Sequence, residues 1–136
     1  MKRIAVSLND EDPDPIVEFI EEELAEYDYS AKAFLQIQVA IEEIFVNIVQ
    51  YSGLSPDDTI EVRCEVLDDP LRAVICFVDA GVPFNPLASD DPDISPEGLM
   101  AREGGLGIFM VKQMMDDTSY VHENGKNVLT ITKNLG

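Results

Sequence analysis

Apolar residues recur at three- and four-residue steps in two stretches near the start of the chain, at about 15–27 and 30–51. This spacing predicts two amphipathic helices, and Ser30 has a side chain suited to cap the second one. The residues expected to be buried are Ile16, Phe19, Ile20 and Leu24 on the first helix and Phe34, Ile37, Ile41, Ile44 and Ile48 on the second. Both helices therefore need another layer against which to pack.

Runs of alternating or continuous apolar residues predict five strands. The predicted strands cover about residues 3–8, 59–67, 71–79, 118–123 and 127–133. The run at 71–79 is almost continuously apolar, which is expected of a central strand that is covered on both faces.

Residues 80–103 differ in composition from the rest of the chain. They contain four prolines, several Asp and Ser residues and few periodic apolar residues. An irregular segment of this length is usually a functional lid or disordered. A further helix is predicted directly after it, at about 105–115.

Length and charge narrow the class of protein. At 136 residues, of which 46% are hydrophobic, the chain is expected to fold as one domain over residues 1–136. Its 27 acidic and 9 basic residues give a net charge of −18. This charge disfavours direct binding of nucleic acid or of an anionic membrane. It favours a basic protein partner, although solubility alone would explain it equally well.

Two cysteines, Cys64 and Cys76, lie in the second and third predicted strands. If these strands form a hairpin, the thiols come near each other, and they are interpreted as small buried hydrophobes rather than a redox pair. No signal peptide is expected before Ile4, and no apolar run is expected to reach membrane-spanning length. These features favour a cytoplasmic protein.

The second predicted helix carries the first of three motifs, Glu43-Ile-Phe-Val-Asn47. A separation of four residues puts Glu43 and Asn47 on one helix face. The amide oxygen of Asn47 is a hard ligand that suits Mg²⁺, and the Glu43 carboxylate suits a base that takes a proton from a hydroxyl. Taken alone, the pair is more often an exposed Glu and Asn on a solvated flank.

The second motif, Asp79-Ala-Gly81-Val-Pro-Phe-Asn85-Pro, follows the predicted central strand. A carboxylate at Asp79 can accept a hydrogen bond from the exocyclic amine of adenine, which guanine does not offer, and Gly81 lets the backbone approach a flat ring. The proline-rich run that contains Asn85 indicates a shaped loop. The alternative is an ordinary strand-to-turn Asp-x-Gly pattern.

The third motif, Gly104-Gly105-Leu106-Gly107, opens the helix predicted at 105–115. The first N–H groups of a helix are unpaired and attract anions, and glycines let a phosphate come close. The pattern is not a P-loop, because no Gly-Lys-Ser/Thr follows it. A flexible helix start is the alternative. In this order, the three motifs together provide a metal ligand, an adenine contact and a phosphate cradle.

These motifs resemble the N, G1 and G2 boxes of the Bergerat-fold ATPases, the GHKL superfamily that includes gyrase and the histidine kinases. The Asp-x-Gly-x-Pro-Phe-Asn-Pro and Gly-Gly-Leu-Gly-Ile-Phe-Met-Val segments look most like those of the anti-sigma-factor serine kinases. The resemblance covers residues 3–133. It implies an α/β fold, an α+β sandwich in which a mixed, mostly antiparallel sheet has helices on one face and ATP lies between the two layers.

The resemblance also implies a role for each motif. Asn47 would bind Mg²⁺, and Glu43 would be the general base. The other residues implied to contact ATP are Asp79, Gly81, Asn85, Gly104, Gly105, Leu106 and Gly107. Residues 84–104 would form the ATP lid.

The activity implied by the resemblance is that of an ATP-dependent serine kinase with protein partners. It would phosphorylate a STAS-type anti-anti-sigma protein, hold a sigma factor inactive, or do both, and the family is compatible with a homodimer. The chain departs from the family in having Tyr51 where many members have His, and Gly125-Lys126-Asn127 where the last strand often begins Gly-Thr-Thr. Two alternatives stay open: a nucleotide-gated binding module without phosphoryl transfer, and an acidic interaction domain whose motifs are only structural.

Overall fold

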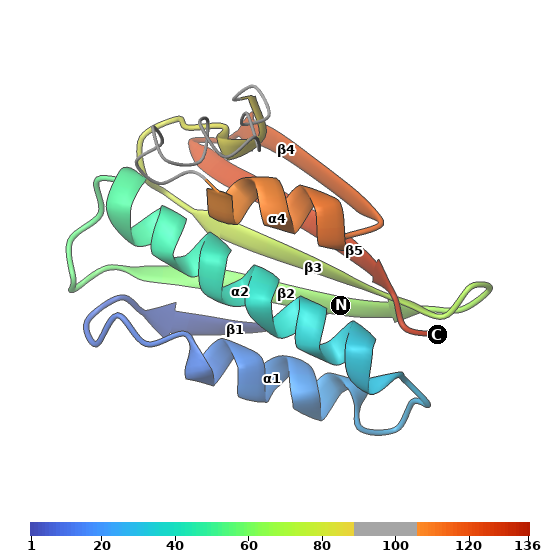
Figure 1. The fold of residues 1–136 in the computed structure, drawn as a ribbon. Helices are drawn as coiled ribbons and strands as arrows, with labels where there is room; N and C mark the ends of the chain where they lie inside the picture. Colours follow the sequence, from blue (N-terminus) through green and yellow to red (C-terminus); the bar gives the residue numbers. More distant parts are fainter. Residues whose placement is uncertain (89–105) are drawn as a thin grey trace.

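The computed structural model describes residues 1–88 and 106–136, which build a five-stranded sheet covered by helices (Figure 1). The elements are β1 (Lys2–Ser7), α1 (Asp14–Leu24), α2 (Ala31–Tyr51), β2 (Thr59–Leu67), β3 (Arg72–Asp79), η1 (Pro86–Ala88), α4 (Leu106–Met114), β4 (Asp117–Glu123) and β5 (Lys126–Asn134). Every helix and strand expected from the sequence is present, with ends that differ by three residues at most.

The strand order is β1-β2-β3-β5-β4, so the nearly continuous apolar strand β3 is central, as predicted. The sequence predicted a mixed, mostly antiparallel sheet, and all four pairings of the described strands are antiparallel. One row of side chains crosses all five strands on the helix-facing side. This row consists of Ile4, Val62, Phe77, Leu129 and Tyr120.

Helices α1, α2 and α4 all cover the same face of the sheet (Figure 1). The apolar stripes predicted for α1 and α2 are buried, except that Phe34 is only partly buried and packs against the ring of Tyr29. The hydroxyl of Ser30 accepts a hydrogen bond from the Ala33 amide at 3.0 Å, which confirms the predicted N-cap. Each fully buried aliphatic side chain contributes about 1.5–3 kcal/mol, so this stripe fixes how α2 is rotated about its axis.

Helix α2 differs in one respect from what the sequence led us to expect. By length and composition alone, this 21-residue helix is sufficient to cross a membrane, because an 18-residue window within it has a mean hydropathy of 1.3, whereas no such run was expected. Helix α2 is more apolar than its buried stripe alone would make it, because the exposed residues Leu35 and Val46 are also apolar. In this fold α2 is the core helix, and its stripe packs on the sheet.

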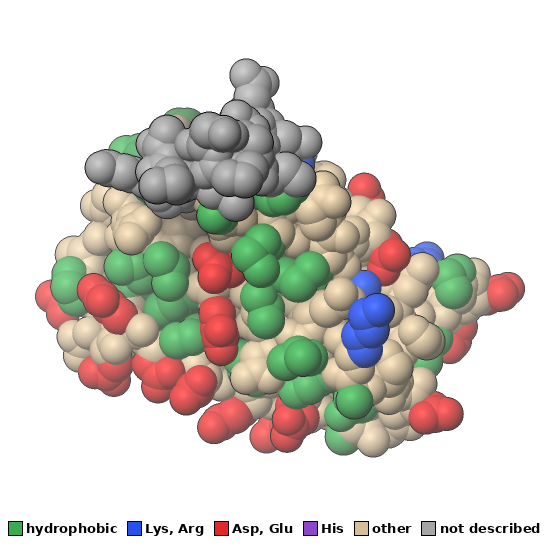
Figure 2. Space-filling model, in the orientation of Figure 1, with side chains coloured by type: hydrophobic (Ala, Val, Ile, Leu, Met, Phe, Trp, Pro, Cys, Tyr) green, Lys and Arg blue, Asp and Glu red, His purple; other side chains and the backbone are tan. Residues whose placement is uncertain are grey.

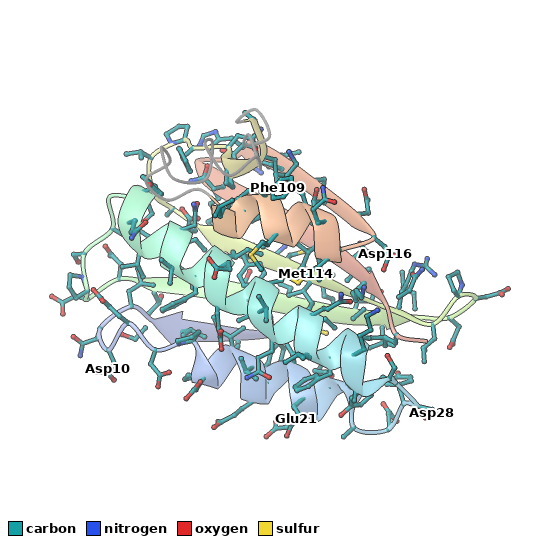
Figure 3. All side chains as sticks on the ribbon, viewed as in Figure 1. Asp10, Glu21, Asp28, Phe109, Met114 and Asp116 are labelled. Carbon is teal, nitrogen blue, oxygen red and sulfur yellow. The ribbon has the colours of Figure 1, made fainter. Side chains whose placement is uncertain are left out.

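Acidic side chains gather along the outer edge of the helical layer, next to α1 (Figure 2). Asp10 and Asp28 lie in the segments on either side of α1, and Glu21 lies on it; all three are exposed and point away from the sheet (Figure 3). Helix α1 itself contains no Lys or Arg. On the face shown in Figure 2, acidic side chains thus line much of this edge.

The two cysteines are buried and free, but they lie on opposite faces of the sheet. Cys64 is opposite Ile75 and Cys76 is opposite Arg63, so the cysteines are offset by one residue in the hairpin register. Because neighbouring residues of a strand point to opposite faces, the thiols are separated by the sheet. The interpretation as buried hydrophobes is confirmed, whereas the expected proximity across the hairpin is wrong.

Burial raises the pKa of the Cys64 thiol from 9.0 to about 12, with smaller contributions from Glu23 and Cys76. The folded protein therefore keeps this proton at a pH at which the unfolded chain has released it. Since the unfolded chain then binds fewer protons, the free energy of unfolding should decrease as the pH rises from 9.0 toward about 12.

In a Cys76→Ser variant, we expect the remaining thiol to react with an alkylating reagent at about pH 8 only as fast as the protein opens. The thiolate is the reactive form, and both its pKa and its burial oppose its formation. Stopped-flow labelling with and without denaturant tests this, and the Cys64→Ser variant gives the rate for Cys76. Labelling of native Cys64 at the rate seen in denaturant would contradict it.

Candidate functional site

A pocket opens between the C-terminal half of α2 and the sheet. Its apolar walls come from Ile44, Ile48, Phe77 and Leu129. Its polar groups include Asn47, Asp79 and Asn127. A largely apolar pocket with a few directed polar groups is the usual form of a small-molecule site.

Asp79, at the end of β3, is the buried carboxylate of this pocket, with 8% of its surface exposed. Its Oδ1 accepts hydrogen bonds from the Gly81 amide at 2.9 Å and from Asn127 Nδ2 at 3.0 Å. Its Oδ2 accepts none from residues 1–88 or 106–136. One oxygen is thus held in place by the protein, and the other is available to a donor in the pocket.

Gly81 lies where the turn after β3 meets the C-terminal end of α2. A Cβ at this position would overlap the carbonyl oxygen of Ser52, the residue that ends α2. The next amide, that of Val82, donates to the same carbonyl at 2.8 Å. In the structure this glycine allows the turn to pack on α2, and the close approach of a ligand to Gly81 stays a prediction.

The first and third motifs meet at the start of α4. Asn47 lines the pocket, whereas Glu43, one helical turn earlier, lies outside its lining. The Glu43 carboxylate lies against Gly107, so closely that a Cβ on residue 107 would overlap it. Glu43 as a whole is half-buried, next to the first turn of α4.

Asn85 and Tyr51 lie at the mouth of the pocket rather than in it. The Asn85 side chain is exposed, and its Oδ1 accepts a hydrogen bond from the Leu87 amide at 2.9 Å, which starts η1. The ring of Tyr51 stacks on that of Phe84, with centroids 5.0 Å apart and planes 20° apart. Phe84 also lines the pocket, whereas Tyr51 does not, and the two residues remain 38% and 50% exposed.

Part of the predicted site lies outside the described residues. Gly104, Gly105 and most of the predicted lid at 84–104 fall in the segment 89–105 that the structure does not describe. Leu106 and Gly107 form the first turn of α4, where the sequence predicted the phosphate cradle to lead into a helix.

The sequence analysis assigned no role to several pocket residues, among them Asn127 and Tyr120. Asn127 is only 5% exposed and binds Asp79, while the Tyr120 hydroxyl donates to Asn127 Oδ1. The signal for Asn127 lies in the alternation of its strand. Asn127 points to the same face of β5 as the buried Leu129 and Ile131. A polar side chain on a buried face needs hydrogen-bond partners.

A family model described as the histidine kinase-like ATPase domain matches residues 6–133. The chain is 28% identical over 107 residues to the serine-protein kinase RsbW of Listeria monocytogenes, covering 74% of this chain and 66% of the relative. It is 30% identical over 95 residues to RsbW of Bacillus cereus, covering 68% of this chain and 59% of the relative. The matches thus span less than two thirds of these relatives' own length.

The fold is shared with solved structures of other proteins. The crystal structure of the RsbU and RsbW domains of Rv1364c from Mycobacterium tuberculosis matches 99% of this chain and 33% of that chain, with a TM-score of 0.62 at 18% identity. The Acinetobacter baumannii histidine kinase AdeS matches 100% of this chain and 68% of that chain, with a TM-score of 0.51 at 15% identity. With a family model that covers nearly the whole sequence, this protein belongs to the histidine kinase-like ATPase domain family.

Proposed function

We propose that this chain binds ATP with Mg²⁺ in the pocket beneath α2 and transfers the γ-phosphoryl group to a serine of a STAS-type anti-anti-sigma protein. In addition to this transfer, or in place of it, the chain holds a sigma factor inactive. The observation that carries the proposal is the state of Asp79. One of its oxygens is fixed by Gly81 and Asn127, and the other is left for a ligand inside a largely apolar pocket.

The base of ATP suits this arrangement. The exocyclic amine of adenine donates to the free Asp79 oxygen, and the apolar walls formed by Ile44, Ile48 and Leu129 accommodate a flat ring. Guanine carries a carbonyl at the same place. A carbonyl facing a buried carboxylate leaves both acceptors without a donor, which costs about 1–3 kcal/mol.

The residues present also fit Mg²⁺. Asn47 offers a hard amide oxygen at the pocket wall. Among the described residues no group of three or more His, Cys, Asp or Glu side chains could hold a metal ion. The remaining ligands would then be phosphate oxygens and water, which is usual for Mg²⁺. When bound, Mg²⁺ neutralises charge on the phosphate oxygens.

Glu43 is the proposed base of the transfer step. Its carboxylate lies one turn from Asn47 and against the first turn of α4, which would face the phosphates. It takes the proton of the partner's serine as the hydroxyl oxygen bonds to the γ-phosphorus. The bond to the bridging oxygen breaks, and ADP leaves with that electron pair. The relatives named serine-protein kinase support this reaction class.

The surface charge and the two cysteines support the proposed protein partner and the proposed cytoplasmic location. The acidic edge beside α1 favours encounter with a basic surface on the partner. Two buried free cysteines fit a reducing cytoplasm. We also propose that residues 1–136 form a single domain and that the protein forms a homodimer.

The second candidate function is a nucleotide-gated binding module that does not transfer phosphate. One observation favours it: α1 contains no Lys or Arg that could neutralise a phosphoryl group in transfer. In that case the same pocket binds ATP, and the partner is regulated by sequestration alone.

Asp79→Asn should weaken ATP binding by roughly 1–3 kcal/mol and reduce the preference for ATP over GTP, because a charged acceptor is replaced by a neutral amide. Titration calorimetry with both nucleotides measures this. Asp68→Asn makes the same charge change in the exposed β2–β3 turn and should leave both affinities unchanged. Equal affinity of the wild-type protein for ATP and GTP would contradict adenine recognition by Asp79.

Asn47→Ala should remove most of the Mg²⁺-dependent part of ATP affinity without changing the melting temperature, because Asn47 is only half-buried. Calorimetry with Mg²⁺ and with EDTA separates the two contributions. Gln50→Ala is the control, one turn further along the exposed side of α2. If Asn47→Ala unfolds the protein instead, the residue is structural.

Glu43→Gln should leave ATP binding intact and reduce phosphoryl transfer by about 10²–10⁴-fold, the usual contribution of a general base. The assay uses radiolabelled ATP and a STAS-type partner, and Glu42→Gln on the neighbouring exposed position is the matched control. Equal transfer by wild type and Glu43→Gln would exclude the role. Nucleotide-dependent partner binding without any transfer would favour the second candidate function.

A further inference from the structure

Asp79 and Asn127 form a direct cross-strand pair between β3 and β5. Residues paired in this way project from the same face of a sheet, and both side chains line the pocket on the helix-facing side. Both are almost completely buried. The carboxylate that would read the base therefore has a single amide as its cross-strand neighbour.

The Asn127 amide has no hydrogen-bonding capacity left for a ligand. Its Nδ2 donates to Asp79 Oδ1 at 3.0 Å and to the Val82 carbonyl at 2.9 Å, and it lies 3.4 Å from the Gly81 carbonyl. Its Oδ1 accepts from the Phe84 amide at 3.3 Å and from the Tyr120 hydroxyl. An amide offers two donor hydrogens and two acceptor lone pairs, so the protein uses all four.

These partners also fix which end of the amide is nitrogen. Every group near Nδ2 is an acceptor, and both groups near Oδ1 are donors. A flipped amide would place oxygen against the Asp79 carboxylate and against two carbonyls. Asn127 therefore has one stable orientation, in which its N–H groups face Asp79 and the turn that follows it.

We infer that Asn127 is a positioning residue for base recognition, which rests on the proposed binding of ATP. By donating to Oδ1, it directs Oδ2 of Asp79 toward the base. By bonding the main chain of Val82 and Phe84, it holds the turn that forms the pocket mouth. It sets the preference for a purine with an amine at position 6 without touching the purine.

The test compares binding of ATP with that of inosine triphosphate, which has a carbonyl in place of the adenine amine. Asn127→Ala should weaken ATP binding about tenfold and change inosine triphosphate binding little, because only the former uses the positioned oxygen. Asn134→Ala, at the far end of the same strand, is the matched control. Equal weakening for both nucleotides would overturn the inference and leave Asn127 as part of the scaffold only.

A second variant covers the case in which the cavity left by alanine unfolds the protein. Asn127→Leu keeps about the size of the side chain but loses both donor hydrogens and the acceptor oxygen. It should lose the preference for ATP in the same way. Asn134→Leu makes the same replacement at the far end of the same strand and should keep the preference.

A double variant identifies the route of the effect. If Asn127 acts through Asp79, Asn127→Ala should have almost no further effect on the preference once Asp79→Asn is present. Additive losses would overturn the inference. If Asp79→Asn itself leaves the preference unchanged, base recognition by Asp79 fails and the inference fails with it. If only the Asn127 variants leave it unchanged, the inference alone fails.

The effect of Asn127 on the turn that contains Val82 and Phe84 can be measured without nucleotide. Asn127→Ala should accelerate hydrogen exchange of the Phe84 amide, which loses its acceptor, whereas the amides within β3 should exchange as in the wild type. Unchanged exchange at Phe84 would overturn the part of the inference that concerns the turn.

Discussion

The burial of one stripe of α2 against the sheet determines where everything else in this protein lies. Ile37, Ile41, Ile44 and Ile48 fix the rotation of the helix about its axis. With that rotation set, the flank that carries Glu43 and Asn47 must face α4 and the pocket, since both residues follow the same helical period. The chemistry at the edge of the core is therefore positioned by apolar contacts that take no part in it.

A second constraint acts at the other wall of the pocket. Where β3 ends, the chain must turn beneath the C-terminal end of α2, and Gly81 gives it the room to do so. The buried Asn127 side chain needs hydrogen-bond partners, because burying a polar group without one is unfavourable. It finds them in Asp79 and in the main chain of Val82 and Phe84, and so it connects a turn without regular secondary structure to β5.

The sequence was sufficient to predict the elements, their amphipathic faces and the central place of β3, because these depend on periodicity within short segments. Contacts between distant segments could not be predicted in the same way. The spacing of glycines indicated close approach at Gly81 and Gly107, but not that the approaching groups would be Ser52 and Glu43. The register that separates Cys64 from Cys76 depends on a turn whose exact alignment no local pattern determines. Asn127 was missed because its meaning depends on a residue 48 positions away.

The contact between Glu43 and Gly107 has a steric consequence. Since residue 107 has no side chain, the Glu43 carboxylate occupies the space beside the first turn of α4 that a side chain at residue 107 would fill. The same space can hold either the carboxylate or a side chain on α4, but not both. The glycine at position 107 is therefore a condition for Glu43 to lie where it does.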